Sequence, residues 1–161
     1  MDLIRRARSG FTIIEMLIVI FVITILVAIA IPNLLADRQE AGDETSCIGS
    51  LRIINAAEAT YRSANATYGT LTQLAESSLI DPALGAASTS GAPRSGYSFS
   101  LSIVSNAQYW VYAEPVYGAG SDVFYTDEAG PIFENSTPGS PSGDASGSLI
   151  ALGGTWEEIG N

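Results

Sequence analysis

The sequence predicts an α+β fold, in which one long N-terminal α-helix packs against a C-terminal antiparallel β-sheet of about four strands. Three observations lead to this fold class: an apolar run over residues 11–31, a helical repeat of apolar residues over 32–64, and strand-like segments from residue 97 onward. The chain has 161 residues, which suits one compact domain and one extended element.

The apolar run of residues 11–31 has the length of a membrane span. Its 21 residues contain one charge, Glu15. As a helix rising about 1.5 Å per residue it would be roughly 31 Å long, close to the thickness of a bilayer's hydrocarbon core. Arginines at positions 5, 6 and 8 precede it, and basic residues favour the cytoplasmic side. We therefore expect one membrane crossing, with the N-terminus in the cytoplasm and the rest of the chain outside.

Three simpler explanations of this run are incomplete. The apolar part of a secretory signal peptide is about 7–15 residues long, which is shorter than this run. A plain membrane anchor leaves Glu15 unexplained, because a charge at the centre of a spanning helix costs about 2.5–3.5 kcal/mol. A carboxylate in the first turn suits the helix dipole, but this does not explain why Glu15 closely follows Gly10 and Phe11.

The segment Ser9-Gly-Phe-Thr-Ile-Ile-Glu15, between a short basic leader and the apolar run, resembles the processing site of type IV prepilins. The resemblance implies that residues 1–10 are removed by a prepilin peptidase that cuts between Gly10 and Phe11. It also implies methylation of the new Phe11 amine. In this family Glu15 would meet the amine of a neighbouring subunit and set the axial register of the filament. The pilin fold has a long curved helix, and a proline in the position of Pro32 kinks it.

The helical pattern continues through residues 32–64, an amphipathic half that follows the apolar half of residues 11–31. We expect one helix from about Phe11 to Ala64, kinked at Pro32 and loosened at Gly42 and Gly49. One stripe of this helix should be buried, comprising Cys47, Leu51, Ile54, Ala57, Tyr61 and Ala64. Glu58 and Arg62 are expected to form an ion pair on another face of the helix.

Residues 65–161 should form a globular head. We expect a turn over 65–70, a short helix over 71–79 and a surface loop over 81–96. Strands are predicted over 97–103, 108–116, 123–126 and 131–134, with the last two joined as a hairpin. In the first strand Tyr97, Phe99, Leu101 and Ile103 alternate and should face inward.

The C-terminal part of the head has weaker patterns. Residues 135–148 are low in complexity and should be a loop, residues 148–152 can add an edge strand, and Trp156 can pin the C-terminus onto the sheet. The single cysteine, Cys47, cannot form an intramolecular disulfide, so this head must fold without one.

Composition argues against several functions. Removing residues 1–10 takes away three arginines and Asp2, which leaves four arginines and sixteen carboxylates. So acidic a surface repels phosphate, and we expect no direct nucleic-acid binding. The chain has no histidine, the commonest general base and metal ligand, so we expect no enzyme activity and no cofactor. Asp122, Asp127 and Glu128 are candidate Ca²⁺ ligands, but a solvated acidic turn explains them as well, and we expect no metal.

Taken together, these features predict the major subunit of a type IV pilus. Such a subunit waits in the inner membrane, and its partners are the prepilin peptidase/methylase, the inner-membrane assembly machinery and identical subunits of an extracellular homopolymer. Filaments of this kind serve adhesion, twitching motility or DNA uptake. Two alternatives stay open: a pseudopilin of a type II secretion system, and a single-span exported binding protein.

Overall fold

The computed structural model describes residues 10–88, 92–116, 122–136 and 155–159, without the side chains of residues 29 and 32–37. The predicted leader arginines therefore lie outside the described residues. By its internal contacts the chain divides into two units, Met1–Arg38 and Gln39–Asn161. The second unit is called the head below.

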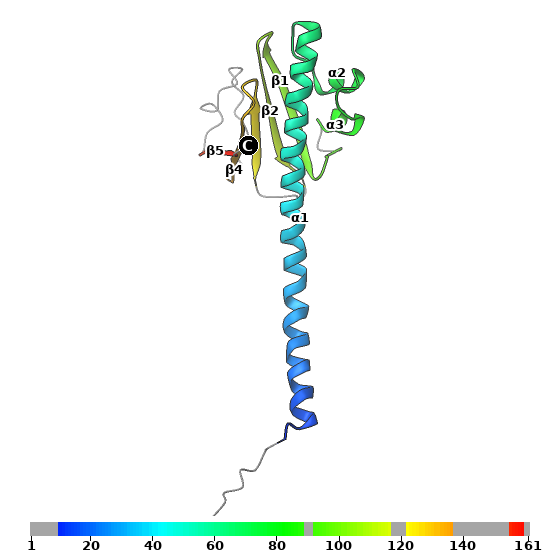
Figure 1. The fold of residues 1–161 in the computed structure, drawn as a ribbon, viewed down its shortest axis with the longest axis vertical. Coiled ribbons are helices and arrows are strands. Elements are labelled where there is room, and N and C mark those ends of the chain that lie inside the picture. The colour runs from blue at the N-terminus through cyan, green and yellow to red at the C-terminus, as the bar shows by residue number, and fades with distance from the viewer. Residues whose placement is uncertain (1–9, 89–91, 117–121, 137–154, 160–161) are drawn as a thin grey trace, which may run out of the picture. The chain divides into compact units, whose positions relative to one another are not determined.

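Helix α1 (Ile13–Asn65) is close to its predicted extent and continuous over 53 residues (Figure 1). It has no break at Gly42 or Gly49, and the loosening predicted there stays a prediction. The helix assignment also continues through Pro32, and the kink at that residue stays a prediction.

Within the part of the chain whose helices and side chains are described, no helix combines the length and the apolar character that a membrane crossing requires.

The sheet is antiparallel, as predicted, with five strands instead of about four. Its strands are β1 (Tyr97–Ser105), β2 (Gln108–Pro115), β3 (Val123–Asp127), β4 (Ile132–Asn135) and β5 (Glu157–Ile159). They lie side by side in chain order, and each pairs with the next in antiparallel fashion. The predicted hairpin is confirmed, since β3 and β4 pair around a turn in which Gly130 has a φ of 97°.

The core of the head lies between the sheet and the C-terminal part of α1, which run alongside each other in Figure 1. Cys47, Leu51, Ile54 and Ala57 of the predicted stripe are buried, whereas Ala64 at its end is exposed. From the sheet the core takes Tyr97, Phe99, Tyr109, Val111, Ala113, Phe124 and Ile132.

Besides that of Ala64, two burial predictions are wrong. Ile103 was expected to face inward but is 37% exposed, because it lies near the end of β1, where the register with β2 shifts. Glu58 was expected to form an exposed ion pair with Arg62 but is completely buried. Arg62 instead donates a hydrogen bond to the Tyr68 hydroxyl at 2.7 Å, and its guanidinium lies over the Tyr68 ring.

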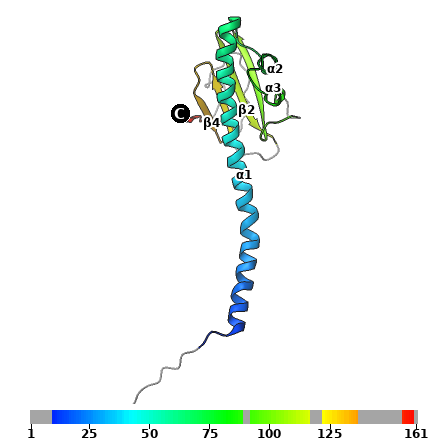
Figure 2. The same cartoon turned by 45° about the vertical axis from the view of Figure 1, so that its right-hand side comes forward.

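Two short helices connect α1 to the sheet and pack against each other (Figure 2). Helix α2 (Leu71–Glu76) is shorter than predicted and begins with a capping box between Thr70 and Gln73. Helix α3 (Pro82–Ala86) lies where a loop was predicted. Its signal was present in the sequence, because Asp81 caps the helix and Pro82 occupies a first-turn position that tolerates proline.

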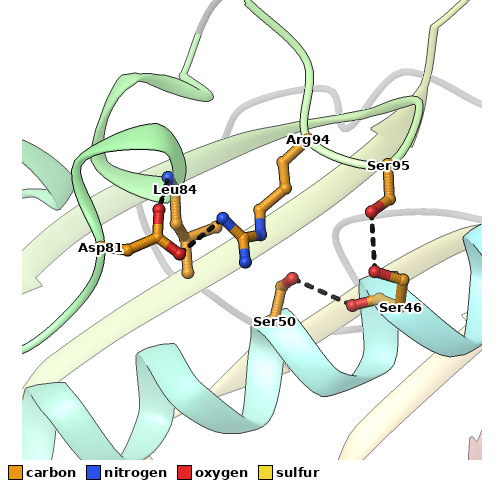
Figure 3. Close-up of polar contacts among 6 residues, drawn as sticks. All are labelled: Ser46, Ser50, Asp81, Leu84, Arg94 and Ser95. Atoms are coloured by element: carbon orange, nitrogen blue, oxygen red, sulfur yellow. Dashed lines mark hydrogen bonds and ion pairs between the residues drawn. The ribbon is translucent and has the colours of Figure 1, made fainter.

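Polar contacts hold Arg94 and Ser95, which lie just before β1, in place (Figure 3). Asp81 accepts a hydrogen bond from the Leu84 amide at 2.9 Å and forms an ion pair with Arg94. Next to Arg94, the Ser95 hydroxyl lies 2.7 Å from that of Ser46 on α1. The turn into β1 is therefore tied both to α3 and to the long helix.

The C-terminal end returns to the sheet, as predicted. The ring of Trp156 makes an edge contact with Tyr125 of β3, at 6.1 Å between centroids, and β5 pairs with β4. The predicted edge strand over 148–152 lies outside the described residues, as does the predicted loop from residue 137 onward.

Candidate processing and assembly site

Gly10 and Phe11, the residues of the predicted cleavage site, precede α1 in non-helical backbone. Phe11 is 71% exposed, and a Cβ added to Gly10 would meet no atom within 4 Å. Within the part of the chain that the structure describes, no packing contact therefore requires glycine at this position.

Thr12 and Glu15 form a capping box at the start of α1. The Glu15 Oε2 atom accepts hydrogen bonds from the Thr12 amide at 2.9 Å and from the Thr12 hydroxyl at 2.8 Å. In return, the Glu15 amide donates to the Thr12 hydroxyl at 3.3 Å. Both amides belong to the first turn, where backbone donors have no partner within the helix.

The capping role of Thr12 was not predicted from the sequence, although the pattern Thr-x-x-Glu before an apolar run is a known sign of a helix start. The capping box explains why α1 begins two residues later than predicted. Among the described residues, the hydrogen bonds that the Glu15 carboxylate accepts both end on Oε2, which leaves Oε1 available to a further donor.

Comparisons with known proteins agree with this arrangement. The prokaryotic N-terminal methylation motif matches residues 5–31, which include Gly10, Phe11 and Glu15. The chain is also 60% identical over 38 residues to the type IV wide pilus major component PilA4 of Thermus thermophilus. That match covers 24% of this chain and 29% of the Thermus protein. The N-terminal region of this chain is therefore similar to that of a type IV pilin.

This matched region presents apolar side chains around its whole circumference. Every described side chain from Phe11 to Ala28 is exposed, including Ile13, Phe21 and Leu26. At about 25 cal/mol per Å², exposing so many large apolar side chains to water is strongly unfavourable. The segment therefore needs an apolar surrounding that the chain alone does not supply to these residues.

The polar side chains of the same segment suit such a surrounding, because all but one oxygen of Glu15 are bonded locally. Thr12 and Glu15 bond to each other, and the Thr24 hydroxyl donates to the Ile20 carbonyl one turn earlier at 2.7 Å. Unsatisfied polar groups are costly in an apolar medium, whereas internally bonded ones are tolerated.

The structure does not gather the calcium candidates into a metal site. The Asp127 carboxylate accepts a hydrogen bond from the Ala129 amide at 2.9 Å, inside the β3–β4 turn. At Asp122, the main-chain oxygen accepts a hydrogen bond from the Tyr97 hydroxyl at 3.1 Å. Among the described residues no group of three or more acidic, histidine or cysteine side chains is arranged to hold a metal ion.

Proposed function

We propose that this chain is the structural, non-enzymatic subunit of a type IV pilus. The observation that carries the proposal is the apolar surface around residues 11–28, in which the polar side chains are bonded locally except for one oxygen of Glu15. A helix of this kind suits two environments in succession, the lipid bilayer and the centre of a bundle of identical helices. Moving between them exchanges lipid contacts for helix–helix contacts, so assembly needs no covalent bond.

The proposed sequence of events begins in the inner membrane, where the N-terminus is cytoplasmic. A prepilin peptidase removes residues 1–10 and the Phe11 amine is methylated. The open surroundings of Gly10 support this step. Because no described contact of the fold requires glycine at this position, the peptidase that binds the site is left as the reason for it. The inner-membrane machinery next assembles the subunits into an extracellular homopolymer that serves adhesion, twitching motility or DNA uptake.

Glu15 is proposed to set the register of assembly. Cleavage creates a cationic amine at Phe11, close to the start of α1. An amine and a carboxylate attract strongly in apolar surroundings, and each is costly there when alone. Glu15 meets the amine of a neighbouring subunit with the oxygen that the capping box leaves available. Pro32 is proposed to bend the helix so that the acidic heads fit around the bundle.

The test is to shear filaments from native cells, purify them and determine the N-terminus and intact mass of the subunit. We expect Phe11 as the first residue, with one added methyl group. A subunit that retains Met1, or one that begins at Ile31, would contradict the proposal. Filaments that lack this chain would also contradict it.

A further inference from the structure

Glu58 is a buried carboxyl group that the proposed filament function does not use. It lies on the core-facing side of α1 with 0% of its surface exposed. Acidic side chains are almost never fully buried unless they are paired, because burial removes the water that solvates the charge. What pairs with Glu58 therefore determines which of its two protonation states the head can hold.

The hydrogen bonding of Glu58 is too sparse for an ionised carboxylate. Oε2 accepts one hydrogen bond, from the backbone amide of Gly69 at 2.9 Å. Oε1 is buried and has no hydrogen-bond partner. An ionised carboxylate offers about four acceptor sites, so most of its capacity is unused here. A neutral carboxyl group has a much smaller demand for donors.

No cation compensates for the burial among the described neighbours. Arg62 lies one turn further along α1, but its guanidinium is bound to Tyr68. From β2, Tyr109 donates its hydroxyl hydrogen to Asn55, and the nearby Glu58 carboxyl group contributes to raising the pKa of Tyr109. The other titratable groups that act on Tyr109 are Tyr68 and the carboxylates of Asp127 and Glu128 in the β3–β4 turn. Burial accordingly raises the pKa of Glu58 to about 7.

The segment that Glu58 holds is a tight turn after α1. Ala66 has a φ of 58°, a left-handed conformation that costs a residue with a Cβ roughly 1 kcal/mol or more. Tyr68 packs on Tyr109 with 4.4 Å between ring centroids. A Cβ on Gly69 would lie only 3.0 Å from the ring of Tyr61, so the backbone there approaches α1 closely. The turn is therefore held by contacts that must offset its strain.

We propose that Glu58 acts as a protonation-controlled latch on residues 66–70, closed when its carboxyl group is neutral and loosened when it ionises. In the closed state the Gly69 amide is bonded to the carboxyl group. Ionisation leaves a buried charge with one hydrogen bond and draws water toward the group. Water reaches it most directly by opening the turn, which also begins α2. The latch is a property of the head and does not depend on the filament.

The experiment measures hydrogen exchange of the Gly69 amide by NMR in the full chain in detergent micelles, from pH 5 to pH 9. Rates are corrected for the intrinsic pH dependence of exchange. We expect the protection of Gly69 to fall at least about tenfold between pH 6 and pH 8. In Glu58→Gln, which keeps an acceptor oxygen and cannot ionise, protection should stay constant. Glu76→Gln removes an exposed carboxylate from α2 and should behave like the wild type.

A second measurement does not depend on any variant. The carbon-13 shift of the Glu58 carboxyl group should titrate well above the ordinary range of glutamate, which lies near 4.3. A midpoint in that ordinary range would overturn the latch. Constant protection of Gly69 in the wild type would also overturn it, as would a Glu58→Gln chain that loses protection with the same midpoint as the wild type.

Discussion

The side-chain amide of Asn55 on α1 donates a hydrogen bond to the hydroxyl of Thr126 on β3, at 2.8 Å and across 71 positions of sequence. The same amide donates to the Gly130 carbonyl at 3.2 Å, and its oxygen accepts from the Tyr109 hydroxyl at 2.8 Å. One side chain thus joins the long helix to β2, to β3 and to the β3–β4 turn.

Asn55→Ala should destabilise the head by about 2–3 kcal/mol, because three hydrogen bonds worth roughly 1 kcal/mol each are lost. Denaturant unfolding of the detergent-solubilised chain measures this loss. Thr60→Ala is the matched control on the same helix. It removes a hydroxyl bonded only to the Ala56 carbonyl within α1, and should change stability by less than about 0.5 kcal/mol. Equal losses in both variants would contradict a bridging role for Asn55.

Gly10→Val should block leader removal and leave the fold unchanged, because a Cβ at Gly10 meets no described atom within 4 Å. Intact mass of the membrane fraction should show a chain that retains Met1, with an unaltered melting curve of the head. Gly42→Val is the control, since a Cβ at Gly42 also meets nothing within 4 Å. That variant should be processed normally. Normal processing of Gly10→Val would show that the peptidase does not require glycine at position 10.

Glu15→Val should leave membrane insertion intact and abolish or severely slow filament assembly. The substitution removes a charge from an apolar helix, so insertion should if anything improve. Because Glu15 also caps α1, Glu15→Gln separates the two roles. Glutamine can still accept the hydrogen bonds from Thr12 but carries no charge to attract the Phe11 amine. Filament counts by electron microscopy should fall in both variants, and normal counts in Glu15→Gln would assign Glu15 to capping alone.

Deleting residues 1–38 should yield a soluble, folded monomer. The boundary coincides with that of the unit Gln39–Asn161, and the core residues from Cys47 onward belong to this unit. The deletion also removes the exposed apolar side chains of residues 11–28, 30 and 31. Circular dichroism and gel filtration decide the matter. An unfolded spectrum, or aggregation that persists at low concentration, would mean that the head requires the rest of the chain or the filament.

The melting temperature of the head should change little between millimolar Ca²⁺ and excess chelator. A bound ion would stabilise the fold by mass action, but the Asp127 carboxylate already closes the β3–β4 turn through Ala129. Differential scanning calorimetry checks this. A rise of about ten degrees with calcium, abolished by Asp127→Ala, would favour a secretion pseudopilin with a calcium-stabilised head over a pilus subunit.

The features that follow from the sequence alone are local ones. Gly10, Phe11 and Glu15 lie within six consecutive positions, so their pattern is complete without any knowledge of the fold. The β3–β4 hairpin has the same character, because its strands and turn are contiguous in the chain. The signal for helix α3 is also local, because Asp81 caps the helix and Pro82 lies in its first turn. We predicted a loop there because this signal was not used.

The burial of Glu58 and the role of Asn55 were decided only by the tertiary structure. Glu58 and Arg62 are four residues apart and lie on one face of an isolated helix, so an ion pair is expected from the sequence. In the folded head, Tyr68, Gly69 and β2 cover that part of the helix. All three follow α1 in the sequence. Whether a carboxylate on a helix stays in water depends on what packs over it, and that is fixed by contacts between distant segments.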